Sequence, residues 1–150
     1  MKRIVFTFFI LMLGQLIYCQ EMSTINIPLN KEMGLDVLSK NKKIKKFDVI
    51  FEKETKGTFN LLKVMSENDT KNVSDIYIRF GKAKFGNSES TVLIIRHKLK
   101  QAISYKARIK VNGEFSETSV VLCHPNVASI EQWNEEIEEI QLYDFKYFKE

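Results

Sequence analysis

Apolar and polar residues alternate along much of the chain, most regularly over 103–111. A period of two places successive side chains on opposite faces of a strand, so this segment is predicted to bury one face and expose the other. Asn112-Gly113 follows directly and favours a type I′ turn, in which both central residues take positive φ. The sequence therefore predicts a hairpin, with these facing pairs: Val111 with Glu114, Ile109 with Ser116, Ala107 with Thr118, Tyr105 with Val120, and Ile103 with Leu122.

Several other short segments rich in β-branched and aromatic residues are also predicted to be strands. Polar stretches that contain Gly, Asn and Ser separate them and supply turn chemistry. Val92-Leu93-Ile94-Ile95 is apolar at every position, which suits a central strand covered on both faces. The predicted strands are residues 47–54, 58–65, 75–80 and 91–98, with a short edge strand over 23–29 that Pro28 ends.

The last twenty residues combine two patterns. Ser129 and Gln132 fit a capping box, and apolar residues recur near helical spacing from Ile130, so we expect one helical turn over 130–135. The aromatic residues that follow favour a terminal strand from about 138 to 148.

Six to seven short strands with almost no amphipathic helix predict an all-β fold. The expected architecture is an antiparallel, immunoglobulin-like β-sandwich with a short helical turn before the last strand. The Cys…Trp…Cys spacing of true immunoglobulin domains is absent, so the expectation concerns architecture and no family. We divide the chain into a signal peptide (1–19), a weakly patterned N-terminal segment with a basic linker (20–46) and the sandwich domain (47–150).

Composition agrees with one compact domain. The chain has 150 residues, of which 44% are hydrophobic and 28% charged, and only 6 Gly and 2 Pro. Its 11 Phe and 5 Tyr are more aromatic surface than an unfolded segment carries, so a packed core is expected.

The N-terminus has the layout of a secretory signal peptide. Lys2 and Arg3 form a positive start, and an apolar run over 4–13 follows that is too short to span a membrane, which takes about 20 residues. Cleavage between Cys19 and Gln20 is expected, which predicts a secreted or periplasmic protein without a transmembrane segment.

A lipoprotein signal is the alternative at the same place. Leu16-Ile17-Tyr18-Cys19 resembles a lipobox, in which the Cys is acylated and becomes the new N-terminus. Tyr18 stands where that pattern has a small residue, so a lipid anchor at Cys19 is the less favoured interpretation.

Charge argues against a nucleic-acid partner. Removing residues 1–19 takes Lys2 and Arg3 from the 23 basic residues and none of the 19 acidic ones, which leaves a net charge of about +2. So small a charge makes no electrostatic footprint for nucleic acid, and we expect none to bind.

One strong local charge signal remains. Five lysines fall within residues 40–46, a run that suits an acidic glycan or an anionic headgroup. A solvated linker, or a strand edge protected against aggregation, is the other interpretation. The candidate binding residues of this run are Lys42, Lys43, Lys45 and Lys46.

An acidic window over 131–144 opposes the lysine run in sign. The two could pair within one molecule or between molecules, although exposed ion pairs contribute only about 0 to 1 kcal/mol each. Trp133 lies in this window and is the remaining candidate binding residue, as a stacking surface for sugars, with core packing as the alternative.

Residues with catalytic or metal-binding chemistry are few. Cys123 and His124 are adjacent, so on a strand they point to opposite faces, and no CxxC or HxxxH pair supplies further zinc ligands. A nucleophilic Cys123 would need His97 to meet it across the sheet. The chain contains no nucleophile elbow and no Gly-rich phosphate loop. We therefore assign no catalytic residue, metal or cofactor.

These observations favour a non-enzymatic binding module whose partner is a protein or a glycan. A structural or assembly component of the cell envelope is the first alternative, and a small hydrolase with an unrecognised site is the second. The expected fold hosts all three classes, so fold alone does not choose among them.

Overall fold

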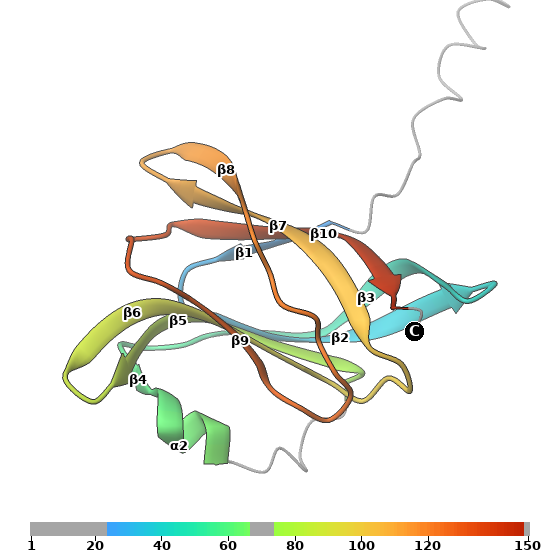
Figure 1. Cartoon of the computed structure of the whole chain (residues 1–150), viewed down its shortest axis with the longest axis horizontal. Helices are drawn as coiled ribbons and strands as arrows, with labels where there is room; N and C mark the ends of the chain where they lie inside the picture. The colour runs from blue at the N-terminus through green and yellow to red at the C-terminus, as the bar shows by residue number, and fades with distance from the viewer. Residues whose placement is uncertain (1–23, 67–73, 149–150) are drawn as a thin grey trace, which may run out of the picture.

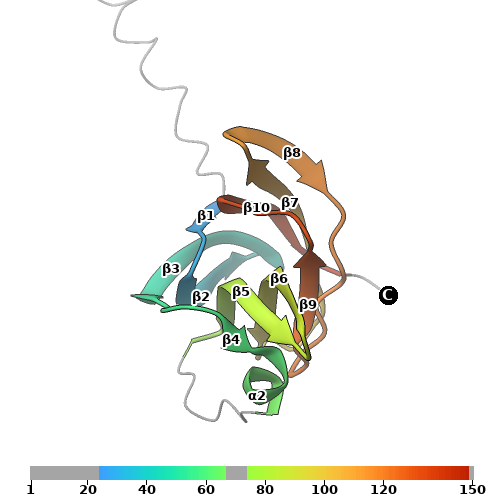
Figure 2. The same ribbon diagram turned by 90° about the vertical axis from the view of Figure 1, so that its left-hand side faces the viewer.

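The computed structural model describes residues 24–66 and 74–148. Two antiparallel sheets pack face to face and form a β-sandwich (Figures 1 and 2). The elements are β1 (Ile25–Pro28), β2 (Lys31–Lys40), β3 (Lys43–Glu54), β4 (Phe59–Asn60), α2 (Leu61–Ser66), β5 (Ile76–Phe85), β6 (Ser88–His97), β7 (Ile103–Val111), β8 (Glu114–Thr118), β9 (Ser129–Trp133) and β10 (Glu139–Tyr147).

The first sheet, sheet A, has the strand order β1-β10-β7-β8. The second, sheet B, has the order β3-β2-β5-β6-β9, and the short β4 runs parallel to the end of β5. The prediction of an all-β antiparallel sandwich is confirmed. The described residues form ten strands, more than the six or seven expected, and the strand order differs from the ABED and CFG sheets of an immunoglobulin domain.

The main core lies between the sheets and is lined by alternate residues of facing strands. β7 contributes Ile103, Tyr105, Ala107 and Ile109, in agreement with the period of two in its sequence. Burial of this apolar surface contributes roughly 25 cal/mol per Å², which makes it the main stabilising term of the fold. From sheet B the core receives Met33, Leu35, Ile76, Ile78, Phe80, Leu93 and Ile95.

β6 is covered on both faces, as its uninterrupted apolar run predicts. Leu93 and Ile95 face sheet A, whereas Val92 and Ile94 face a second, smaller cluster. α2 and β4 supply the cover on that outer side, and Figure 2 shows α2 beneath sheet B.

The prediction of a strand over 58–65 is wrong beyond its first residues. Only Phe59–Asn60 is extended, and α2 follows. The Asn60 side chain accepts a hydrogen bond from the Lys63 backbone N–H (3.0 Å), which is the geometry of a helix N-cap. Leu61 and Val64, three positions apart, then bury one helical face against sheet B.

The helical turn expected over 130–135 is also wrong, because Ser129–Trp133 forms strand β9. It pairs with β6 from Ile95 opposite Ser129 to Thr91 opposite Trp133. A helix of one or two turns is marginal by itself, so the backbone bonds offered by the edge of β6 outweigh the local capping signal. The terminal strand predicted from about 138 to 148 is confirmed as β10.

Residues 24–46, the described part of the N-terminal segment, belong to the sandwich. β1 is the predicted edge strand, and it pairs with β10 in sheet A. β2, which sequence patterning did not identify, lies inside sheet B between β3 and β5. The prediction that residues 40–46 form a linker is therefore wrong, because these residues form the hairpin that joins β2 to β3.

β2 needs a glycine at its centre. A Cβ atom on Gly34 would lie 2.3 Å from Cε1 of Phe51 and 2.7 Å from Oγ of Ser74. Gly34 therefore lets the Phe51 ring cross over β2, which a larger residue would prevent.

The hairpin between β7 and β8 has the predicted turn and the predicted register near it. Asn112 and Gly113 both have positive φ (50° and 82°), and Val111 faces Glu114. Further from the turn the prediction is wrong by one residue, because Ile103 bridges to Cys123 instead of Leu122. The β7–β8 ladder ends at Thr118. The segment that follows is one residue longer than the predicted register requires, so Cys123 faces Ile103 and is buried.

Replacement of Gly113 tests this turn. We expect Gly113→Val to lower the free energy of unfolding by more than about 1 kcal/mol, because a β-branched residue is strained at positive φ. A Cβ atom there meets nothing within 4 Å, so backbone strain alone causes the loss. Urea denaturation measures it, and Gly113→Asn is the matched control, since Asn tolerates positive φ and should cost less. Equal midpoints for the Val variant and the original chain would contradict the turn.

Candidate binding site at the lysine-rich end of the sandwich

The β2–β3 hairpin projects beyond the rest of sheet B, at the end of the molecule where β10 also finishes (Figure 1). Its two turn residues, Asn41 and Lys42, have φ of 55° and 59°. This is the same two-residue turn geometry as at Asn112-Gly113, with a lysine in place of the glycine. We call residues 40–46 the lysine hairpin; all five of its lysines are exposed.

The base of the lysine hairpin is fixed to sheet A. The Phe47 and Phe145 rings meet edge to face with centroids 4.8 Å apart, and the hydroxyls of Ser39 and Tyr147 are hydrogen-bonded at 2.7 Å. These contacts join β2 and β3 to β10, so the hairpin is held on two sides at its base.

A carboxylate pair fastens β2 to the start of β5. Asp75 accepts a hydrogen bond from the Val37 N–H (2.9 Å), and the Asp75 N–H donates to the Asp36 carboxylate (3.1 Å). The Lys98 N–H in turn donates to the Asp75 carbonyl (2.9 Å), which anchors the connection from β6 to β7 beside them.

These segments line an open, shallow pocket of about 430 Å³, which we call the lysine pocket. Lys42 reaches it from the hairpin, and Lys98 and Lys100 reach it from the connection between β6 and β7. Ser39, Asp75 and Tyr147 supply polar groups to the same walls. Residues far apart in the chain thus place three lysines, a serine and a tyrosine around one opening.

The predicted binding residues divide between two places. Lys42 lines the lysine pocket, whereas Lys43, Lys45 and Lys46 follow it along the exposed edge strand β3. Lys98 and Lys100 were not identified from the sequence, because they are isolated lysines in a loop and only the crossing from sheet B to sheet A brings them to the hairpin.

Trp133 lies elsewhere. It faces Thr91 on β6, six residues before His97, which corresponds to roughly 20 Å along a strand. Its ring is partly buried against the main core, and its indole N–H donates to the Thr118 hydroxyl (3.1 Å). The structure does not bring Trp133 together with the lysines.

The acidic window over 131–144 does not pair with the lysine hairpin. Glu136 contacts Lys82 (2.8 Å), Glu138 contacts Lys110 (3.7 Å), and Asp144 contacts Lys106 and Lys146. The expected intramolecular attraction between the two charged runs is therefore wrong, because nearer lysines take these carboxylates.

A second group of polar residues lies inside the sandwich. His97 and Cys123 do meet, but His97 Nε2 lies 3.0 Å from the Cys123 carbonyl oxygen, to which it donates in the neutral ring. Burial raises the pKa of the Cys123 thiol to about 11 and also raises the pKa of Tyr105. A protonated, buried thiol is a poor nucleophile, so this group packs the core and does not form an activated Cys–His pair.

Within residues 24–66 and 74–148, no three His, Cys, Asp or Glu side chains gather in a way that could hold a metal ion. No helix in those ranges is both long and apolar enough to cross a bilayer.

Comparison with known proteins adds no assignment. No family model, no curated protein and no solved structure matches this chain. Functional inference therefore starts from the lysine pocket and its surroundings.

His97 predicts a dependence of stability on pH. Burial, and to a lesser extent the nearby His124, lowers its pKa below 6.5, and its Nδ1 has no hydrogen-bond partner. The folded state therefore binds fewer protons than the unfolded state, so stability is full above about pH 6.5 and falls as the pH drops toward the folded-state pKa.

We expect the free energy of unfolding to fall between pH 6.5 and 5 by up to about 1.4 kcal/mol per pH unit from this group. Denaturant titrations at several pH values measure the slope. His97→Gln keeps an N–H donor for the Cys123 carbonyl but does not titrate, so the slope of the free energy of unfolding against pH should become smaller. His124→Gln, at an exposed position, should retain most of that slope. Identical slopes for His97→Gln and the original chain would contradict this assignment.

Proposed function

We propose that this chain is an exported, non-enzymatic binding module that holds an anionic ligand at the lysine-rich end of its sandwich. The observation that carries the proposal is the lysine pocket, where Lys42 and Lys100 come together from segments far apart in the sequence. Cationic groups that converge on a concave surface attract and retain anions.

Four lysines at this end have no carboxylate partner among the described residues. Among the described residues, no carboxylate lies within 4 Å of the ammonium groups of Lys42, Lys43, Lys45 or Lys100, and only Lys46 has a distant one, Asp48 at 3.9 Å. Several lysines on other parts of the sandwich are paired with Glu or Asp: Lys31, Lys82, Lys106, Lys110 and Lys146. Lys42 and Lys100 therefore bring positive charge to the pocket without a carboxylate partner among the described residues.

Edge protection accounts for only part of this arrangement. β3 is an edge strand, and lysines and bulges on such strands discourage pairing with other chains. That role fits Lys43, Lys45 and Lys46, but Lys42 and Lys100 lie outside β3. These two residues are the ones that favour a binding role over simple solubility.

The backbone at Lys42 supports the same interpretation. A non-glycine residue at φ 59° costs free energy that glycine would avoid. Lys42 therefore occupies a turn position at which glycine would be more stable, which is consistent with a use for its side chain.

The two alternative classes receive less support. Self-association through opposite charges would need the acidic window, whose Glu136, Glu138 and Asp144 already contact lysines of the same molecule. A hydrolase would need an activated nucleophile or a pair of catalytic carboxylates, and the lysine pocket contains the single carboxylate of Asp75, which accepts a backbone hydrogen bond.

Charge removal at the hairpin tests the proposal. We expect replacement of Lys42, Lys43, Lys45 and Lys46 by Gln to weaken binding to polyglutamate at low salt by about tenfold or more, since exposed contacts contribute about 0.3 to 1 kcal/mol each. Binding should also fall as salt is raised, because exposed charges are screened within about 8 to 10 Å near physiological ionic strength. Biolayer interferometry with immobilised polymer measures both effects, and the melting temperature should stay within a few degrees.

The matched control removes the same number of charges elsewhere. Gln at Lys53, Lys56, Lys63 and Lys84, all exposed and away from the pocket, should leave most of the binding intact. The pair Lys42→Gly and Lys100→Gln separates the pocket from the β3 edge: it should weaken binding while the glycine keeps or raises stability. Equal losses in the hairpin and control variants would mean that net charge alone retains the polymer.

The N-terminus of the isolated protein tests export and anchoring. We expect expression in a secreting bacterial host to yield a chain that starts at Gln20, which intact mass spectrometry determines. A diacylglyceryl adduct on Cys19 would instead establish the lipoprotein signal.

A further inference from the structure

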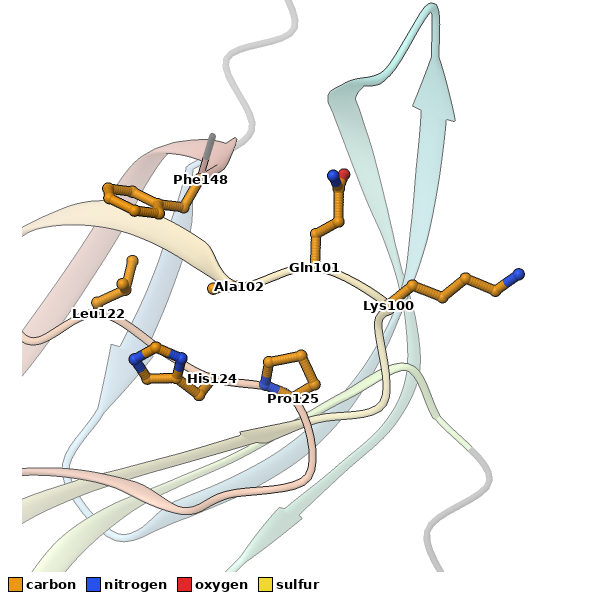
Figure 3. A pocket seen from close by; sticks show the side chains of 7 residues that line it. All are labelled: Lys100, Gln101, Ala102, Leu122, His124, Pro125 and Phe148. Carbon is orange, nitrogen blue, oxygen red and sulfur yellow. The ribbon is translucent and has the colours of Figure 1, made fainter. Parts of the chain in front are cut away.

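A second pocket adjoins the lysine pocket. It has a volume of about 600 Å³, and Lys100 and Gln101 line both pockets. We call it the Phe148 pocket. Figure 3 shows the Phe148 ring on one side of the opening and His124 with Pro125 on the other, while Lys100 projects away from the rings.

The position of Phe148 is set by the backbone. Its N–H donates to the Ala102 carbonyl (2.8 Å), which holds the end of β10 beside the connection that carries Lys100. The ring is nevertheless 45% exposed. An aromatic side chain on a fixed backbone, with much of its surface in water, offers a flat apolar face to a ligand.

The rest of the Phe148 pocket mixes apolar and polar groups. Leu122 and Pro125 add apolar surface, and Gln101 and His124, both exposed, add hydrogen-bonding groups. An acyl chain requires an enclosed, mostly apolar cavity, so this lining does not suit a lipid tail. A flat molecule with an apolar face and a polar rim fits it better.

We propose, building on the proposed function, that the anionic ligand is an acidic oligosaccharide that occupies both pockets. A pyranose ring has an apolar C–H face, which would lie on Phe148, and hydroxyl groups at its rim, which would reach Gln101 and His124. The carboxylate or sulfate of the same or the next sugar would face Lys42 and Lys100 in the lysine pocket. Because Lys100 and Gln101 line both pockets, a chain of a few sugars would contact both.

Two carboxylate polymers separate sugar recognition from charge recognition. Polygalacturonate carries its carboxylates on sugar rings, whereas polyglutamate carries them on a peptide. At equal ionic strength we expect the full-length protein to bind polygalacturonate about three to ten times more tightly than polyglutamate, by stacking on one aromatic ring. Dextran, an uncharged sugar polymer, should bind weakly, because it has no anionic group that the lysines could bind.

Phe148 variants test whether this residue causes the preference for polygalacturonate over polyglutamate. Phe148→Ala and Phe148→Leu should reduce affinity for polygalacturonate to the level of polyglutamate and leave polyglutamate binding unchanged. Phe148→Leu keeps an apolar side chain, so a loss in both variants at an unchanged melting temperature reports the missing ring. Phe115→Ala is the matched control: Phe115 is 43% exposed but lies on β8, and its removal should change neither affinity.

The outcomes separate this inference from the proposed function. Equal affinity for the two polymers, with no effect of either Phe148 variant, overturns the oligosaccharide and leaves the anion-binding function standing. Failure to bind either polymer overturns both. A single-stranded oligothymidylate that binds more tightly than polygalacturonate, and loses that affinity in Phe148→Ala, overturns the oligosaccharide in favour of a nucleic acid, whose bases also stack on aromatic rings.

Discussion

The β5–β6 pair has apolar side chains on both of its faces, and the rest of the fold follows from the need to cover them. Sheet A covers the inner face, where Phe80, Leu93 and Ile95 are almost completely removed from water. α2 covers the outer face around Val92 and Ile94. Because β7 must lie over the inner face of sheet B, the chain crosses between sheets directly after β6, and that crossing carries Lys98 and Lys100 to the end of the molecule.

The candidate site is thus a product of how the sheets are joined. The same end of the sandwich receives the β2–β3 hairpin and the end of β10, which the contact of Phe47 with Phe145 holds together. The lysine pocket rests on a sheet scaffold, although Lys42 and Lys100 lie on a turn and a connection, where binding residues are commonly found. The Asp75 carboxylate in the same pocket accepts a hydrogen bond from a backbone N–H of β2.

The buried His97 and Cys123 differ from the exposed lysines in being uncharged. His97 is held neutral by burial, and the Cys123 thiol keeps its proton, so neither contributes charge or an activated nucleophile. Both residues pack in the core, and the hydrogen bond between His97 Nε2 and the Cys123 carbonyl joins β6 to the segment after β8. These two buried residues are thus uncharged, whereas the lysine hairpin presents exposed positive charge to solvent.

The sequence alone determined the local features whose cause is local. The period of two over 103–111 and the Asn112-Gly113 turn predict β7 and its hairpin, because alternation and positive φ are properties of a few consecutive residues. The continuous apolar run at Val92–Ile95 likewise predicts a strand covered on both faces. The lysine run likewise predicts a strongly charged segment from consecutive residues alone.

Tertiary structure decided whatever depends on a distant partner. The edge of β6 made residues 129–133 a strand, and the open face of sheet B made residues 61–66 a helix. At Asp144 an irregularity in β10 shifts the inward face from Leu142 to Phe145, which alternation does not reveal. Lys42, Lys100 and Phe148 became neighbours in the same way, since hydrogen bonds between strands far apart in sequence, and not the residues themselves, fix where each strand ends.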